Sequence, residues 1–368
     1  MTRFEDVPLM QIARPKQWPT LSRRELKSEG FPVYGANGVI GFADKYTHDS
    51  PTLIIGCRGS CGTLHITEPK SYVTGNAMAL DALDTTRADQ RYIFHFLESR
   101  GFADVISGSS QPQITGKGLA RVRIPLPSIL DQRRIADILD KAKGVRRKQV
   151  VALGAVDDLL KSEFVARFGT PMSNSKHLPT APIKLLGKVV TGNTPPRKDP
   201  SNYGDKIEWI KSDNINTPYH FLTRAEEYLS ATGIRLSRTV PTGSTLVTCI
   251  AGSPSVIGNA ALADREVAFN QQINAVIPND QTDPFFLYSQ IIVAKSLIQA
   301  SSTNSMKGMV SKGKFQEIEF LKPSQNEQVE FGKFFTRAIA MTKRLEADWK
   351  ESEQLLGSLA QRAFRGEL

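Results

Sequence analysis

The chain contains 368 residues, more than one ordinary hydrophobic core accommodates, and this length favours two domains. Hydrophobic residues make up 40% of it and charged residues 23%, a composition that excludes a wholly disordered protein. Its 47 Lys and Arg residues exceed its 37 Asp and Glu residues, and the formal net charge of +10 favours a polyanionic partner. No apolar run is long enough to span a membrane and the first residues lack the apolar segment of a signal peptide, so we expect a cytoplasmic protein.

Short segments rich in β-branched residues and bounded by Gly, Pro or Asn are typical of strands. In chain order they occupy residues 51–57, 72–80, 121–127, 244–250 and 272–278. Apolar residues at helical spacing predict helices over 90–99 and 284–299, at corresponding places in the two halves. The sequence therefore predicts an α+β protein with two mixed α/β domains.

Two longer helices are predicted, each directly after a strand that ends in proline. In 128–170 the apolar residues from Ile135 to Phe164 recur mostly three or four apart, and those from Phe331 to Leu359 do the same in 324–368. Each apolar stripe needs a partner helix. The economical solution packs the two helices against each other as an antiparallel, coiled-coil-like pair. The alternative, in which each helix covers only its own domain, stays open.

An internal repeat relates the two halves of the chain. Phe364 lies 196 residues after Phe168, and the same offset carries Pro127 onto Pro323 and Gln132 onto Gln328. Further upstream the match continues with small shifts, and there we pair 52–55 with 245–248 and Asn76 with Asn270. The chain is two copies of one plan, a mixed globular part followed by a helix, and we expect an internal pseudo-two-fold repeat.

Three phrases stand out within this plan: PVYGANGVIGF (32–42), TGNTPPRKDPSNYGDKIEWIKSDNI (191–215) and the terminal FRGEL (364–368). With the duplication, the order of the parts and the length, they resemble the specificity (S) subunits of type I restriction-modification systems. The resemblance covers essentially the whole chain. It implies a target-recognition domain at 1–127, a central spacer helix at 128–170, a second target-recognition domain at 171–323 and a C-terminal spacer helix at 324–368.

The resemblance also implies partners. Such subunits read an asymmetric two-part target in double-stranded DNA, one half with each domain. They recruit type I methyltransferase subunits, which bind S-adenosylmethionine, and motor-nuclease restriction subunits, which bind ATP and Mg. The chain itself would be a non-catalytic DNA-recognition subunit without a cofactor.

The chain contains only weak matches to catalytic and metal-binding motifs. An adenine methyltransferase needs (Asp/Asn)-Pro-Pro-(Tyr/Phe), and the nearest string, 194–197, reads Thr-Pro-Pro-Arg. A short Glu-x-Lys nuclease pattern occurs at 25–27 and again at 68–70, which shows how readily it arises by chance. The three cysteines and five histidines show no metal-ligand spacing, and we expect no metal site.

Two alternatives stay open. One is a stand-alone restriction nuclease or methyltransferase with a divergent active site. The other is a coiled-coil scaffold whose basic surface binds RNA or nothing. The basic run over 141–148 on the first long helix fits either a phosphate contact or a solvated helix face.

Base recognition needs basic, amide and aromatic side chains on loops, because phosphate contacts position a protein and paired donors and acceptors discriminate bases. In the first domain these candidates are Tyr34, Asn37, Lys45, Tyr46, Arg58, Ser60, Gln111, Gln113 and Lys117. In the second domain they are Thr194, Arg197, Lys198, Asn202, Tyr203, Lys211, Asn214, Asn304, Lys307 and Lys312.

Overall fold

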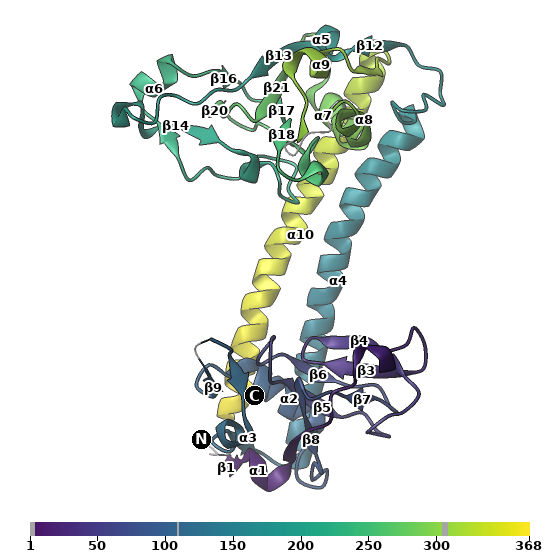
Figure 1. Ribbon diagram of the computed structural model, residues 1–368, viewed down its shortest axis with the longest axis vertical. Helices are drawn as coiled ribbons and strands as arrows, with labels where there is room; N and C mark the ends of the chain where they lie inside the picture. Colours follow the sequence, from purple (N-terminus) through teal and green to yellow (C-terminus); the bar gives the residue numbers. More distant parts are fainter. Residues whose placement is uncertain (1–3, 109, 304–307) are drawn as a thin grey trace. The chain divides into compact units, whose positions relative to one another are not determined.

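Two long helices and two sets of short strands make up the computed structural model, which describes residues 4–108, 110–303 and 308–368 (Figure 1). The chain divides into two units. Unit 1 comprises residues 1–151 with 346–368, and unit 2 comprises residues 152–345. In the described part of the chain, no helix combines the length and the apolar character that crossing a membrane requires.

Unit 1 is built on a four-stranded antiparallel sheet of order β2-β8-β5-β6, beside which β3 pairs with β4 and, in parallel, with β7. Leu53 and Ile55 point to the face covered by helix α2, and Ile54 points to the opposite core, as the two-residue period of a strand dictates. The strands are β1 (Glu5–Pro8), β2 (Arg14–Gln17), β3 (Phe31–Gly35), β4 (Gly38–Ala43), β5 (Leu53–Gly56), β6 (Leu64–Ile66), β7 (Tyr72–Val73), β8 (Ala77–Asp81), β9 (Ile106–Ser107), β10 (Gln113–Ile114) and β11 (Arg123–Leu126). The helices are α1 (Leu9–Ile12), η1 (Arg23–Glu25), α2 (Gln90–Arg100) and α3 (Gly116–Leu119).

Unit 2 repeats this plan with the sheet β13-β21-β17-β19, and its second sheet, β15-β14-β20-β16, again contains one parallel pair, β14 with β20. Its strands are β12 (Thr180–Pro182), β13 (Gly187–Thr191), β14 (Tyr203–Ile210), β15 (Tyr228–Leu229), β16 (Thr239–Val240), β17 (Thr245–Thr248), β18 (Ile250–Ala251), β19 (Ala260–Leu262), β20 (Val267–Phe269), β21 (Ile273–Pro278), β22 (Gly308–Met309) and β23 (Glu319–Leu321). Its short helices are α5 (Ile183–Leu186), η2 (Pro200–Asn202), η3 (Ser212–Asn214), α6 (Ala231–Arg235), η4 (Pro254–Val256), α7 (Pro284–Val293), α8 (Lys295–Ala300) and α9 (Lys312–Gln316).

The long helices are α4 (Ile129–Phe168) and α10 (Gln325–Arg365), and each contributes to the core of both units. In unit 1 the start of α4 shares a core with the end of α10, where the rings of Tyr92 and Phe364 lie 5.6 Å apart. In unit 2 the end of α4 shares a core with the start of α10, where Phe164 and Phe331 lie 5.4 Å apart. The two helices therefore pack antiparallel within each unit and also cover its sheet. The predicted fold class, mixed α/β with paired long helices, is confirmed.

A buried glutamine joins the start of each long helix to its sheet. The side chain of Gln132 is fully buried: its Oε1 accepts a hydrogen bond from Asp89 N (2.8 Å), and its Nε2 donates to Pro127 O (2.9 Å) and to Arg87 O (2.8 Å). Asp89 in turn caps α2 by accepting from the backbone N–H groups of the first turn. One amide thus joins α4, the cap of α2 and the end of β11.

The repeat reproduces this contact in unit 2. Gln328 is 1% exposed, accepts from Asp283 N (3.1 Å) and donates to Pro323 O (3.0 Å). Asp283 caps α7 as Asp89 caps α2. Because a buried amide left without partners is costly, the pair of contacts fixes where each helix begins.

Strand register corrects two of the upstream matches in the repeat. Strand β5 (53–56), rather than 52–55, corresponds to 245–248, since Ile55 and Val247 both face the helix-covered side of their sheets. Asn76 corresponds to Gln272, because each directly precedes the matching strand β8 or β21. A one-residue slip would turn every side chain to the other face, so burial decides the register.

Three predicted elements are interrupted. The strand expected over 244–250 is β17 followed, after Cys249, by the start of β18. The helix expected over 284–299 is two helices, α7 and α8, separated at Ala294. The strand expected over 72–80 is β7 followed by β8, with the turn residues between them outside either strand. All three cysteines are free thiols, with Cys57 and Cys249 buried.

We predict that Gln132→Leu lowers the free energy of unfolding of unit 1 by about 3 kcal/mol, because it removes the partner of the partly buried N–H of Asp89 and of two carbonyl groups. The control is Gln325→Leu at the start of the other long helix, in unit 2, which removes one exposed hydrogen bond to Asp280 O (2.8 Å) and should cost about 1 kcal/mol or less. Urea denaturation of the two variants measures both. Equal losses would show that the buried amide does not fix the start of α4.

Candidate nucleic-acid interface

In unit 1 the structure brings several candidate loops together. Asn37 is exposed in the turn between β3 and β4, and Arg58 and Ser60 are exposed in the loop after β5. The hydroxyl of Thr63 joins the two loops, since its single O–H is shared between Ser60 O (2.9 Å) and Ala36 O. The turn and the loop therefore form one edge of the unit.

The segment 111–117 meets the same edge. Arg58 and Gln113 face each other across an isolated antiparallel β-bridge, and Ile114 N donates to Cys57 O (3.0 Å). Gln111 is exposed just before this bridge, and Lys117 is exposed on α3 just after it. Candidates that are distant in sequence thus share one surface, the unit 1 loop cluster: Asn37, Arg58, Ser60, Gln111, Gln113 and Lys117.

The remaining candidates of unit 1 lie elsewhere. Lys45 and Tyr46 follow the end of the β3–β4 hairpin that is opposite to Asn37. Lys45 Nζ is 3.2 Å from Glu25 Oε1, and the Tyr46 ring packs edge-on against Phe31 at 4.9 Å. Tyr34 is buried, and its hydroxyl accepts from Glu68 N (3.2 Å).

In unit 2 the candidates gather around the ring of Trp209. The Arg197 guanidinium lies 4.8 Å from the ring centroids of both Tyr203 and Trp209, and Lys211 Nζ lies 5.4 Å from that of Trp209. Glu227 accepts hydrogen bonds from Arg197 (2.7 Å) and from Lys211. We call Arg197, Tyr203, Trp209, Lys211 and Glu227 the unit 2 aromatic–cation cluster.

One carboxylate holds two cations in this cluster. The hydrogen bonds from Lys211 and Arg197 lower the pKa of Glu227, and Glu227 raises the pKa of Arg197. Two positive charges against one negative charge leave the cluster positive. The Arg197 side chain remains 53% exposed, so it is held against the rings with part of its guanidinium open to solvent.

The other candidates of unit 2 differ in exposure. The Thr194 hydroxyl donates to the side chain of Gln271, and Asn214 accepts from Lys211 N (3.0 Å). Asn202 is buried and donates to Pro196 O (3.1 Å). Lys198 and Lys312 are exposed, the latter on α9. Asn304 and Lys307 lie outside the described residues.

Sequence reasoning missed Trp209, Glu227 and Gln271. Trp209 lies on β14, between two candidate residues that it contacts. Because alternate residues of a strand share one face, its place two residues before Lys211 could have predicted that the two side chains lie together. Glu227 has no such signal, since it is acidic and far along the chain from both cations. Gln271 lies in the turn before β21. Only the pairing of the strands brings this turn beside Thr194.

The two units share one backbone frame at this edge. In unit 1 the amides of Cys57 and Arg58 both donate to Asn76 O, and in unit 2 the amides of Cys249 and Ile250 both donate to Gln272 O. The bridge partners differ, however. Arg58 faces Gln113 in unit 1, whereas at the corresponding place Ile250 faces Met309 in unit 2.

The two cations that lower the pKa of Glu227 can be tested by titration. Its carboxyl should titrate below its ordinary value of 4.5, and Lys211→Met should raise that pKa because it removes the largest cause of the shift. The stabilisation of the folded state by the ion pairs of Glu227 is present above pH 4.5. It is lost as the pH falls through the lowered pKa of Glu227. Carboxyl-carbon NMR titration measures the pKa. Arg235→Met, an exposed control on α6, should leave it unchanged, and an equal change in both variants would contradict the contact.

Comparisons with known proteins identify the family of this chain. The model of a family described as the type I restriction modification DNA specificity domain matches residues 1–144 and 180–355. The HindI specificity subunit of Haemophilus influenzae is 28% identical over 194 residues, which cover 50% of this chain and 40% of that protein. The EcoprrI specificity subunit of Escherichia coli is 31% identical over 119 residues, 32% of this chain and 29% of that protein. The chain thus matches less than half the length of either relative.

Two solved structures have a similar fold. The type I restriction-modification system S subunit from M. genitalium is 14% identical with a TM-score of 0.62, over 99% of this chain and 97% of that one. A chain from a structure on complex assembly and conformational transition of the type I R-M system is 15% identical, also with a TM-score of 0.62, over 100% of this chain and 99% of that one. Since the family model matches most of the sequence in both halves, the chain belongs to the type I restriction modification DNA specificity domain family.

Proposed function

We propose that this chain is the sequence-specific DNA-binding subunit of a type I restriction-modification complex. Residues 1–127 and 171–323 act as target-recognition domains, and the helical segments 128–170 and 324–368 act as spacers between the two half-sites. The target is asymmetric and interrupted.

One observation carries the proposal beyond family membership. The same backbone frame occurs in both units, but it displays Arg58 and Gln113 in one and Ile250 and Met309 in the other. Arg and Gln read guanine and adenine edges, whereas apolar side chains contact the thymine methyl group. Two copies with different side chains at the same place support two different half-sites.

The exposed candidates supply the contacts. In unit 1 the loop cluster presents Arg58 and the amides of Asn37, Gln111 and Gln113 for base edges, with Lys117 for phosphate. Lys45 and Tyr46 form a separate contact, and the buried Tyr34 acts by holding its strand.

In unit 2 the contacts come from the aromatic–cation cluster, Thr194, Lys198 and Lys312, together with the predicted Asn304 and Lys307. Asn202 and Asn214 hold the backbone of the loops beside it. The net charge of +10 supports a polyanionic partner.

Catalysis belongs to the partners. Methyltransferase subunits bring S-adenosylmethionine, motor-nuclease subunits bring ATP and Mg, and this chain brings recognition without catalytic groups. Since these partners act on chromosomal DNA, the complex works in the cytoplasm.

We predict that the purified chain transfers no methyl group to duplex DNA in the presence of S-adenosylmethionine and Mg. Together with type I methyltransferase subunits it should direct methylation to one asymmetric, interrupted sequence, read out by sequencing the methylated genome of a host with and without the gene. Methyl transfer or cleavage by the chain alone would favour a stand-alone enzyme. Structured RNA that displaces duplex DNA from the chain would favour an RNA-binding scaffold.

A further inference from the structure

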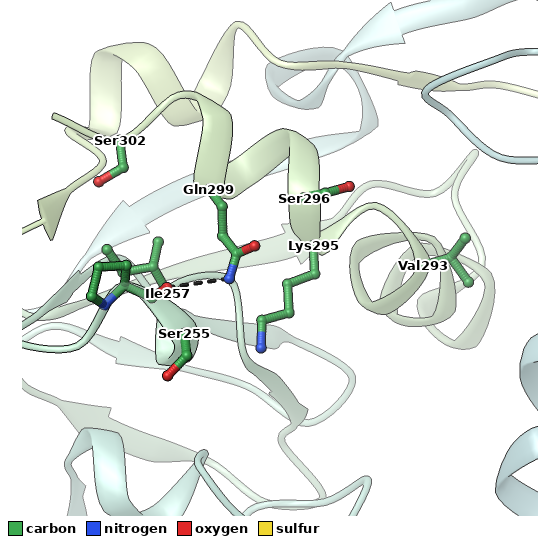
Figure 2. A pocket seen from close by; sticks show the side chains of 8 residues that line it. Ser255, Ile257, Val293, Lys295, Ser296, Gln299 and Ser302 are labelled. Carbon is green, nitrogen blue, oxygen red and sulfur yellow. Dashed lines mark hydrogen bonds between the residues drawn. The ribbon is translucent and has the colours of Figure 1, made fainter. Parts of the chain in front are cut away.

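A pocket of about 720 Å³ with a mixed polar and apolar lining lies in unit 2 between the loop after β18 and the helices α7 and α8 (Figure 2). Its described lining contains one ammonium, hydroxyl groups and an amide, and no carboxylate. Figure 2 shows the side chain of Lys295 extending from α8 and that of Ser255 extending from the loop after β18. The lining residues are Pro254, Ser255, Ile257, Val293, Lys295, Ser296, Gln299 and Ser302.

The ammonium of Lys295 is held in place without an opposite charge. Its Nζ donates to Asn259 Oδ1 (2.6 Å), and the Asn259 amide is oriented because its Nδ2 donates to Asn216 Oδ1 (2.9 Å). Within the described ranges, which include all 37 Asp and Glu residues of the chain, Lys295 has no ion pair. Partial burial lowers the pKa of Lys295, whose ammonium has a neutral amide oxygen as its hydrogen-bond acceptor.

The pocket is formed in advance of any ligand. Gln299 Nε2 donates to Pro254 O (3.2 Å) and ties the loop to α8. Gly258 has a φ of +82°, and a Cβ there would lie 3.0 Å from Lys295 Cγ and 3.1 Å from Lys295 O. The loop therefore packs closely on the aliphatic part of Lys295, and the ammonium extends past it to Asn259.

The fold does not require a lysine here. Gly62 is the counterpart of Gly258, since its N–H donates to Gly56 O as that of Gly258 donates to Thr248 O. In unit 1 the side chain facing this glycine is Phe102, whose ring would lie 3.1 Å from a Cβ added to Gly62. An apolar ring packs on the glycine in one copy, whereas the aliphatic part of Lys295 and the side chain of Ile298 pack on it in the other, so the Lys295 ammonium has no match at the glycine of unit 1.

We propose that this pocket holds a phosphodiester group of duplex DNA, with Lys295 and Ser255 as its donors. The inference rests on the proposed function and adds a contact that sequence analysis did not identify. A single positive charge beside hydroxyl donors, with no acid in the described lining, matches a phosphate monoanion with several acceptor oxygens. The pocket also adjoins predicted contact segments: its loop corresponds to that of Arg58 and Ser60, and Ser302 stands just before 304–307. Such a contact positions the protein and carries no base specificity.

The test compares Lys295→Gln with the wild-type chain in binding to a duplex of arbitrary sequence and to a duplex with the mapped target, over a series of salt concentrations. Loss of one phosphate contact should weaken both affinities several-fold and make the slope of log K against log salt shallower by about 0.9. Lys295→Arg should bind nearly as the wild type does. The control Lys322→Gln removes an exposed lysine of the same unit, outside the pocket, and should change neither quantity.

A second measurement needs no variant. Bound duplex DNA should protect Lys295 from amine acetylation, read by mass spectrometry, and should leave Lys322 reactive. Unchanged affinity and slope in Lys295→Gln, or an unprotected Lys295 in a DNA-bound chain, would overturn the pocket while leaving the proposed function intact. Loss of affinity for the target duplex alone would indicate base reading and would also overturn it. Failure of the wild-type chain to bind duplex DNA at all would instead contradict the proposed function.

Discussion

A buried glutamine amide at the start of each long helix is the contact on which the rest of each unit depends. Gln132 and Gln328 each accept from the capping aspartate of the sheet-covering helix and donate to the carbonyl of the proline that ends the preceding segment. Because unpaired buried amides are costly, these bonds hold the sheet, its covering helix and the long helix as one body. The remaining packing around them is apolar and tolerates substitution of similar volume.

Because the glutamine contacts anchor the helices, the side chains on the loops at the strand ends are free to vary between the two units. The backbone bonds from Cys57 and Cys249 to the turn before β8 or β21 are retained, whereas the bridged side chains beside them differ. Within unit 2 the loops add their own order, since Glu227 holds Arg197 and Lys211 beside the ring of Trp209. A rigid frame with individually braced loops suits recognition, because contacts held in advance lose less entropy on binding.

The sequence predicted the long helices and the repeat because both rest on periodic apolar patterns and on a constant offset of 196 residues, as between Phe168 and Phe364. It missed the break at Ala294, since the apolar run continues through it without Gly or Pro. It also missed Lys295, Trp209 and Glu227. Their roles depend on tertiary contacts such as Lys295 with Asn259, and no spacing rule encodes contacts between segments brought together only by folding. Exposure could not be read from residue type either, as the buried Tyr34 and Asn202 illustrate.

The central claim is that each unit reads its own half of one interrupted target. Arg58→Ala in unit 1 and Arg197→Ala in unit 2 address it most directly when each variant is assembled with methyltransferase subunits and the methylated sequence is mapped. The claim predicts that each variant relaxes base preference in a different half of the target and leaves the other half and the gap unchanged. Relaxation of the same half by both variants, or of both halves by either one, would contradict it.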